Sequence, residues 1–304
     1  MSKRWRMPLI LAALMAISIF ISACGGDTTT GANPTSTAPA STDGVTCAQG
    51  TLRTNGSTAL APLVQDAAKA YQAKCSGSSI TTQLTGSSAG LTAVSGGNAD
   101  VGNSDVFADA TKYPGLTDHQ VAVVVFSVVI NSKVTGVTNL TSAQLLNIFT
   151  NKVSNWKDVG GPDMPIVHVA RPAGSGTRLT FEKFVLNGTT ESGEKLTKNT
   201  TGEVAQTIKS TDGSISYVAT SAVTKQGLTA IKIDGVADTD DNVKSNSYKF
   251  WNIEHMYTKG EASGLAKAFI DYVKGPATAD LRKKDGFLDF SVMSQSAIDA
   301  KQPK

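Results

Sequence analysis

The chain is poor in the residues that supply metal, redox or stacking chemistry. It holds three cysteines, three histidines and only 6% aromatic residues. His119, His168 and His255 lie in unrelated sequence contexts, without the His/Cys/Asp/Glu spacing of a metal site. We therefore expect neither a metal nor a cofactor. With so few aromatic side chains, Trp156 and Trp251 are better interpreted as packing residues than as platforms that stack sugars.

An excess of charge is also missing once the first 23 residues are set aside. The formal net charge is +3, and Lys3, Arg4 and Arg6 account for it, because the rest of the chain holds 25 basic and 25 acidic residues. Affinity for a phosphate backbone comes from clustered Lys and Arg, which release counterions. No such cluster is visible in the sequence, so no nucleic acid is expected as a partner.

Residues 1–23 have the layout of a secretory signal, with a basic start, an apolar run and small residues before Cys24. The apolar run is about 15 residues long, shorter than the roughly 20 that span a bilayer. Ile21-Ser22-Ala23-Cys24 resembles a lipoprotein cleavage box, which predicts lipidation of Cys24 and a lipid-anchored protein outside the cytoplasmic membrane, at a cell surface or in a periplasm. An uncleaved anchor with an incidental cysteine is the alternative.

A stretch rich in Thr, Ser, Ala, Gly and Pro follows the signal. Such a segment cannot bury enough apolar surface to offset its ordering entropy, so we predict a flexible tether over residues 24–49. An oxidising compartment permits Cys47 and Cys75 to pair, which would join the first strand to the end of the first helix. Two free thiols are the alternative.

Beyond residue 50, strand-like runs alternate with helical patterns, which predicts an α/β architecture with mostly parallel sheets. Val121–Ile130 predicts a central strand covered on both faces. Ala61–Lys74 predicts a helix, Thr141 and Gln144 predict a capping box, and Asn187–Gly202 predicts a surface loop. Other predicted strands and helices cover residues 51–55, 80–85, 91–94, 100–102, 142–149, 166–170, 180–186, 214–218, 231–233, 263–273 and 281–290. About 280 residues exceed a single core, so we expect two domains or two interleaved lobes.

Three junctions between a strand and a helix combine glycine with hydroxyl side chains: Asn55-Gly56-Ser57-Thr58, Gly86-Ser87-Ser88-Ala89-Gly90 and Gly174-Ser175-Gly176-Thr177. Glycine permits close backbone approach and the first N–H groups of a helix are free, so each junction can bind a tetrahedral oxyanion. One junction predicts little, because Ser and Thr cap helices everywhere. Three junctions, with Arg171 four residues before Ser175, predict an oxyanion site.

In this interpretation Asp105 discriminates between two oxyanions, phosphate and sulfate. A carboxylate repels a bound anion unless the anion has a proton to donate. At neutral pH phosphate carries such a proton and sulfate does not, so Asp105 predicts phosphate rather than sulfate. An exposed loop acid or a helix cap is the alternative for this residue.

A rival function follows from Gly86-Ser87-Ser88-Ala89-Gly90, which also satisfies the G-x-S-x-G pattern of a hydrolase nucleophile elbow. It would make Ser88 the nucleophile of a serine hydrolase. A triad needs a histidine, and none of the three lies in a supporting context. We therefore expect a protein that is not an enzyme, and a binding protein for another oxyanion, such as sulfate or molybdate, is the nearer rival.

The chain resembles the phosphate-binding proteins of bacterial ABC phosphate importers over nearly all of residues 51–295. The motifs that carry the resemblance are Gly56-Ser57-Thr58 with Pro62, Gly86-Ser87-Ser88, Ala99-Asp100-Val101-Gly102 with Ser104-Asp105, Leu140-Thr141 through Ile148-Phe149, Asn155-Trp156-Lys157-Asp158-Val159-Gly160-Gly161 and Arg171-Pro172-Ala173-Gly174-Ser175-Gly176-Thr177-Arg178. The last two are specific in combination. The tail around Gly286–Met293 fits the family only loosely.

The resemblance implies a two-lobed α/β fold like that of type II periplasmic binding proteins, with two hinge crossings and a ligand cleft between the lobes. Residues 50–128 and 249–304 would form the first lobe and residues 129–248 the second. It also implies a monomer that captures inorganic phosphate and delivers it to the permease subunits of an ABC importer in the membrane.

The resemblance also implies the phosphate-binding residues, which are Thr58, Ala59, Ser87, Ser88, Asp105, Arg171, Ser175, Gly176 and Thr177. Hydroxyl and backbone groups would donate, Arg171 would provide the charged fork and Asp105 would accept the proton of the ligand. Ala59 departs from the larger residue that some relatives place there, but its contribution would come mainly from its backbone N–H.

Overall fold

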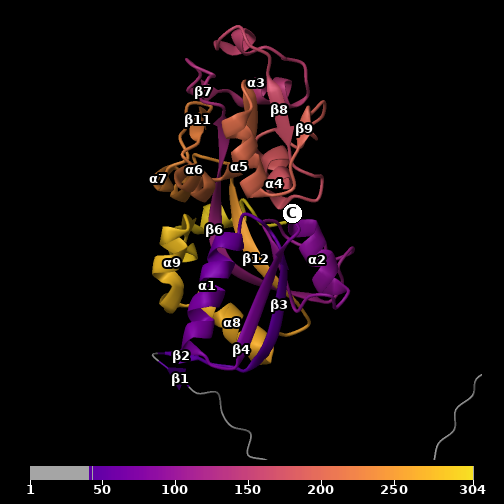
Figure 1. Cartoon of the computed structure of the whole chain (residues 1–304), viewed down its shortest axis with the longest axis vertical. Helices are drawn as coiled ribbons and strands as arrows, with labels where there is room; N and C mark the ends of the chain where they lie inside the picture. The colour runs from indigo at the N-terminus through magenta and orange to yellow at the C-terminus, as the bar shows by residue number, and fades with distance from the viewer. Residues whose placement is uncertain (1–40, 43, 304) are drawn as a thin grey trace, which may run out of the picture. The chain divides into compact units, whose positions relative to one another are not determined.

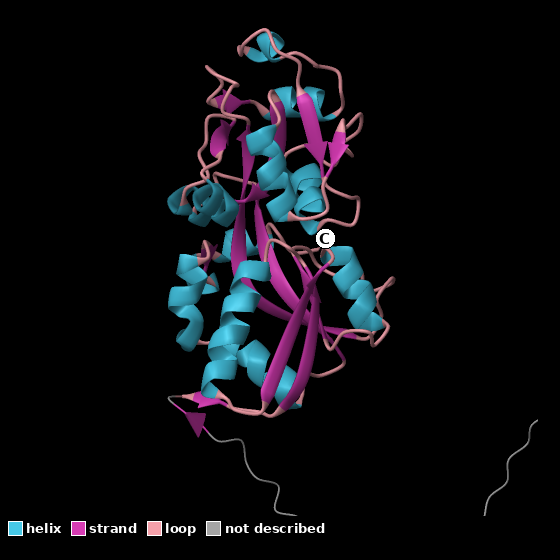
Figure 2. Cartoon of the chain, viewed as in Figure 1, coloured by secondary structure: helices cyan, strands magenta, loops and turns pink. Residues whose placement is uncertain are grey.

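The structure, a computed structural model, describes residues 41–42 and 44–303. The predicted signal segment, Cys24 and most of the predicted tether lie outside these residues. Within the described residues no helix is both long enough and apolar enough to cross a membrane. Strands and helices alternate along the described chain and form two α/β lobes (Figures 1 and 2), which confirms the predicted fold class.

The first lobe is built on strands that pair in the order β4-β3-β5-β12-β6. β3 is parallel to β4 and β5, whereas β12 is antiparallel to both β5 and β6. Figure 1 shows α1 and α2 on opposite sides of β3. The elements of this lobe are β3 (Gly50–Gly56), α1 (Ala61–Lys74), β4 (Ser78–Leu84), α2 (Ser87–Ser95), β5 (Val101–Ser104), β12 (Trp251–Lys259), α8 (Gly264–Lys274), α9 (Ala279–Lys284), β13 (Phe287–Leu288), α10 (Gln295–Asp299) and the first part of β6 (Leu116–Ile130).

The second lobe continues from the end of β6, which is antiparallel to β10 and β11, while β8 is parallel to β10 and β9. The sheets are therefore mixed rather than mostly parallel, because β6 and β12 run against their neighbours. The elements are β7 (Asn139–Leu140), α3 (Ser142–Phe149), a 3₁₀ turn (Trp156–Val159), β8 (Val167–Ala170), α4 (Gly176–Phe184), β9 (Leu196–Thr197), α5 (Thr201–Ser210), β10 (Ser214–Ala219), α6 (Thr220–Gln226), β11 (Thr229–Ile233) and α7 (Asp240–Lys244).

The long strand β6 connects the lobes by changing partners along its length. Val123–Val125 pairs with β12 of the first lobe, and Phe126–Ile130 pairs with β10 of the second. The part from Val121 to Ile130 is buried at every position, which confirms the predicted central strand. The chain returns to the first lobe where β12 begins at Trp251.

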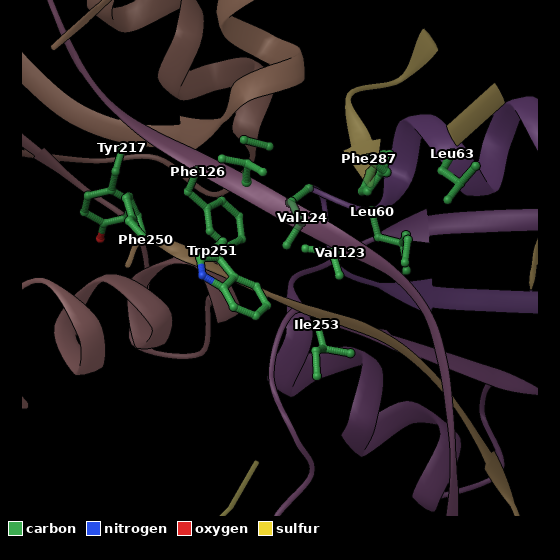
Figure 3. Close-up of a cluster of buried hydrophobic side chains, with 14 of the residues drawn as sticks. Leu60, Leu63, Val123, Val124, Phe126, Tyr217, Phe250, Trp251, Ile253 and Phe287 are labelled. Carbon is green, nitrogen blue, oxygen red and sulfur yellow. The ribbon is translucent and has the colours of Figure 1, made fainter. Parts of the chain in front are cut away.

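Aromatic side chains pack around this connection. Figure 3 shows Phe126, Phe250, Trp251 and Tyr217 gathered beside the two crossing strands. The ring centroids of Phe126 and Phe250 lie 5.2 Å apart, and both side chains are fully buried. Trp251 is fully buried as well, in agreement with its interpretation as a packing residue. The core is thus continuous from one lobe to the other.

The chain is ordered a few residues before the expected end of the tether at residue 49. Two short strands, β1 (Ser41–Thr42) and β2 (Val45–Thr46), pair with each other, and Val45 is buried. The Tyr71 hydroxyl donates to the Thr46 carbonyl at 2.9 Å. A disulfide joins Cys47 to Cys75, directly after α1. The segment from Val45 onwards therefore belongs to the first lobe.

Most predicted elements are present, with bounds that differ in an informative way. The helix at 61–74 and the capping box of Thr141 and Gln144 are confirmed. α2 and α4 begin at Ser87 and Gly176, several residues earlier than predicted, so two of the glycine-rich junctions are themselves the first turns of helices. The predicted surface loop at 187–202 is only partly a loop, because it contains β9 and a fully buried Glu191 side chain.

Candidate functional site

Four helix starts meet where the two lobes face each other. Two belong to the first lobe, at the turn before α1 and at the start of α2, and two belong to the second lobe, at the starts of α4 and α5. Hydrogen bonds between side chains connect them across the lobe boundary. Because the first N–H groups of a helix have no partner inside the helix, this arrangement concentrates donors in one place.

Asp105 lies at the centre of this arrangement, directly after β5, and is 2% exposed. Its carboxylate accepts hydrogen bonds from the Ser57 hydroxyl and, at 2.9 Å, from the Thr177 hydroxyl of the other lobe. Its backbone N–H donates to the Ser87 hydroxyl at 3.1 Å. Asn252 on β12 donates to its carbonyl oxygen at 2.7 Å. Asp105 is therefore fixed from both lobes, and is neither an exposed loop acid nor a helix cap.

Arg171 reaches the same place from the second lobe and is 1% exposed. Its Nη2 donates to the Thr58 hydroxyl at 3.1 Å and to the Asn199 carbonyl at 2.9 Å. Its Nε and Nη1 are buried and have no hydrogen-bond partner among the described residues. A buried guanidinium with two unsatisfied nitrogens is suited to two oxygens of one anion.

The electrostatics of this pair follow from burial. Burial raises the pKa of the Asp105 carboxyl, and the hydrogen bonds from Ser57 and Thr177 and the charge of Arg171 oppose that rise. Burial lowers the pKa of the Arg171 guanidinium, and the charge of Asp105 acts in the opposite direction. Each group thus supports the charged form of the other in a region with little solvent.

The turn before α1 places Ser57, Thr58 and Ala59. The Ser57 hydroxyl accepts from the backbone N–H groups of Ala59 and Leu60, at 3.1 and 3.0 Å, while it donates to Asp105. The Ala59 N–H is therefore used inside the turn. The Thr58 hydroxyl lies 3.0 Å from the Thr201 hydroxyl and also accepts from the Thr201 N–H.

Glycine is required where α4 meets the first lobe. A Cβ atom on Gly176 would overlap with the Ser87 hydroxyl and would lie 2.8 Å from the Cβ of Asp105. Ser175 caps the same helix, because its hydroxyl accepts from the Arg178 N–H at 3.4 Å. The glycine and the cap together bring the Thr177 hydroxyl to Asp105.

Ser87 and Ser88 differ in their positions. Ser87 is buried and bonded to Asp105, as described above. Ser88 instead donates its N–H to the Gly174 carbonyl of the second lobe at 3.0 Å, and lines an open pocket of about 540 Å³. Arg171 and Asn199 line that pocket as well, so the pocket lies beside Arg171.

The histidines lie elsewhere within the described part of the chain. His119 bonds to Thr258, His168 to Glu191 and His255 to Asp118. The three histidines therefore each have a partner of their own, and none of these partners is Ser88.

Several residues of the site were not predicted from the sequence. Ser57 lies in the predicted Gly56-Ser57-Thr58 motif, but the resemblance points to Thr58 rather than Ser57 as a ligand-binding residue. The sequence does contain a signal for Thr201, because Thr200 and Glu203 form a capping box at the start of α5. Asn199 and Asn252 carry no such signal, because their place in the site depends on how β12 and the loop before α5 pack.

Comparisons with known proteins show the family of the chain. The model of a PBP superfamily domain matches residues 41–276. The phosphate-binding protein PstS of Bacillus subtilis is 41% identical over 88% of both chains, and PstS 3 of Mycobacterium leprae is 29% identical over 86% of this chain and 78% of its own.

Solved structures give the same result. A protein from Clostridium perfringens, assigned as a phosphate ABC transporter substrate-binding protein and solved with bound phosphate, is 28% identical and aligns with a TM-score of 0.74 over 79% of this chain and 99% of its own. An ABC-type phosphate transport receptor from Vibrio cholerae is 25% identical, with a TM-score of 0.64 over 78% of this chain and 99% of its own. The chain therefore belongs to the PBP superfamily and, within it, to the family of the PstS phosphate-binding proteins.

Proposed function

We propose that this protein captures inorganic phosphate outside the cytoplasmic membrane and delivers it to the permease of an ABC phosphate importer. The observation that carries the proposal is the pairing of two buried groups from opposite lobes. Asp105 can accept a hydrogen bond from the ligand, and Arg171 has two nitrogens without a partner among the described residues. The named functions of the relatives support the same ligand.

Phosphate fits this pairing better than sulfate or molybdate does. Arg171 and the helix starts donate to the oxygens of any tetrahedral oxyanion. Asp105 is a carboxylate held among hydroxyl donors, so a fully deprotonated anion beside it would meet repulsion without a compensating hydrogen bond. Phosphate at neutral pH carries a proton that it can donate to Asp105.

The ligand-binding residues in this proposal are those expected from the sequence, with two additions. Ser57 and Thr201 join Thr58, Ala59, Ser87, Ser88, Asp105, Arg171, Ser175, Gly176 and Thr177. Ala59 takes part through the turn that it forms with Ser57, because its N–H already donates to the Ser57 hydroxyl. Ser57 orients Asp105, and Thr201 holds the Thr58 hydroxyl. Ser88 lies at the edge of the site, where it lines the pocket that lies beside Arg171.

Closure of the lobes couples binding to transport in this mechanism. The first lobe comprises residues 45–128 and 249–304, so it begins a few residues earlier than the sequence predicts, and the second lobe comprises residues 129–248. The lobes rotate about β6 and the start of β12. The change of partners between Val125 and Phe126 lies close to the first boundary. Phosphate contacts both lobes only in the closed form, so it shifts the population towards that form through this difference in contacts.

A catalytic role for Ser88 is not part of the proposal. The histidines are bonded to Thr258, Glu191 and Asp118, and a triad needs a histidine beside the nucleophile. A chromogenic ester tests this directly. We expect no turnover, whereas turnover that disappears in Ser88→Ala would establish the hydrolase.

The cellular setting rests on the N-terminal sequence. In the proposal residues 1–23 are removed, Cys24 is lipidated and the protein acts as a monomer beside the permease. Labelling of growing cells with a radioactive fatty acid tests the anchor. We expect the wild type to carry the label and Cys24→Ala to lack it, and equal labelling of both would reject the anchor.

The function itself is tested by isothermal titration calorimetry with protein freed of bound anion. We expect saturable binding of phosphate with a micromolar or lower dissociation constant and no heat from sulfate. Binding of sulfate or molybdate in preference to phosphate would identify the rival oxyanion, and binding of none of the three would reject the proposal.

A further inference from the structure

A second carboxyl group lies next to Asp105 and takes no part in the site described above. Glu254 is on β12, two residues after Asn252, whose side chain bonds to the Asp105 carbonyl. Residues two apart on a strand face the same side, so Glu254 faces Asp105 as well. The side chain is 0% exposed, and neither carboxyl oxygen has a hydrogen-bond partner among the residues that the structure describes.

Two adjoining buried carboxyl groups cannot both be ionised without a large penalty, so the pair holds one proton at neutral pH. The surroundings decide which member keeps it. Asp105 receives hydrogen bonds from Ser57 and Thr177 and is stabilised by Arg171, whereas Glu254 has no donor in the described chain. The negative charge therefore resides on Asp105 and the proton on Glu254.

The directions in which the surroundings shift the two pKa values agree with this assignment. Burial, and then the charge of Asp105, raises the pKa of Glu254 well above its ordinary range. His255, the next residue on β12, bonds to Asp118 instead. Glu254 in turn lowers the pKa of Asp105, as an additional donor would.

We propose that Glu254 is a positioning residue that keeps a proton and donates it to Asp105, so that Asp105 remains an acceptor for the hydroxyl of a protonated oxyanion. The inference rests on the proposed phosphate function and extends it to the source of selectivity. An ionised carboxylate offers about four lone-pair sites. Ser57, Thr177, Glu254 and the hydroxyl of the ligand would fill them, which leaves none for a second proton.

Two substitutions of similar size separate this role from a merely structural one. Glu254→Gln keeps an N–H donor towards Asp105 and stays neutral, whereas Glu254→Met fills the space without a donor. Loss of the donor raises the pKa of Asp105, so Asp105 becomes protonated at a higher pH. A protonated Asp105 no longer accepts from phosphate and can donate to sulfate.

The experiment is calorimetric titration of the wild type and both variants with phosphate and with sulfate between pH 5 and 9. At pH 7 we expect Glu254→Gln to bind phosphate within about threefold of the wild type and Glu254→Met to bind it about ten- to a hundredfold more weakly. In Glu254→Met the decline of phosphate binding towards acid begins at a higher pH and sulfate binding emerges. Wild-type pH dependence and selectivity in Glu254→Met, or equal losses in both variants, would overturn the inference.

Infrared spectroscopy tests the proton without any ligand. At pH 7 the wild type should show the band of a protonated carboxyl group, and Glu254→Gln should lack it. Identical spectra would refute the assignment even if Glu254→Met did not fold. A wild type that shows the band but binds no phosphate would uphold the proton on Glu254 and reject the proposed function alone.

Discussion

The two lobes bring opposite chemistry to the place where they meet. The first lobe contributes an acceptor, Asp105, which is already bonded to Ser57 and Thr177. The second lobe contributes a donor, Arg171, of which two nitrogens have no partner in the described chain. The hydrogen-bonding capacity of Asp105 is thus partly used within the protein, whereas two donors of Arg171 stay free within the described residues. This difference suggests separate roles for the two lobes. In the proposed mechanism the second lobe supplies most of the attraction for any oxyanion, and the first lobe decides which oxyanion is accepted.

Removal of the second-lobe charge should have the largest effect. Arg171→Ala loses charge-assisted hydrogen bonds to the anion, worth about 1.5 to 3 kcal/mol, so phosphate should bind about ten- to a hundredfold more weakly by calorimetry. Arg53→Ala is the matched control, because Arg53 forms an exposed ion pair with Asp100 away from the site. Equal affinities of Arg171→Ala and the control would remove Arg171 from the site.

Neutralising the first-lobe acceptor should change selectivity more than attraction. Asp105→Asn retains the shape of the side chain and adds a donor, so sulfate should begin to bind while phosphate weakens by about tenfold. Because burial raises the pKa of Asp105, wild-type phosphate binding should fall with acid at a pH above the ordinary carboxyl range. This decrease of phosphate affinity at low pH should be absent in Asp105→Asn. Persistent exclusion of sulfate by the variant would contradict the proposed role of Asp105.

The hydrogen bond that joins the two sides should have a smaller effect. Thr177→Val removes the hydroxyl that donates to Asp105 at 2.9 Å and keeps the volume of the side chain. We expect a loss of about 1 kcal/mol, or about fivefold in phosphate affinity. Thr207→Val on α5 is the control, because its hydroxyl bonds within its own helix. A loss of the same size in both would point to a general effect on stability.

Thr201→Val should have the smallest effect on phosphate affinity among these substitutions. The Thr201 hydroxyl lies 3.0 Å from Thr58, but the backbone N–H of Thr201 bonds to the same hydroxyl and survives the substitution. We expect about a twofold loss of phosphate affinity, from about 0.5 kcal/mol. A tenfold loss by calorimetry would show that the start of α5 contributes to closure as much as α4 does.

The local parts of the site could be predicted because each has a signal within a few residues. Glycine followed by hydroxyl residues marks the starts of α2 and α4, and the burial of Val121–Ile130 follows from a run that is rich in β-branched residues and apolar except at Ser127. No part of α5 is predicted, although Thr200 and Glu203 form a capping box at its start. The polar composition of residues 187–202 predicts a surface loop, although the capping-box pattern at its end indicates the start of a helix.

The sequence by itself determined the chemical content of the protein. It contains Arg171, Asp105 and three glycine-rich junctions between strands and helices, and it has no excess charge beyond the first 23 residues. Only the tertiary structure decided that Asp105 and Arg171 approach each other from different lobes and that Glu254 on β12 faces Asp105. The physical reason is distance along the chain, because 66 residues separate Asp105 from Arg171 and 149 separate Asp105 from Glu254. Local patterns cannot encode such contacts, which depend on how β6 and β12 cross between the lobes and on which side chains are excluded from water there.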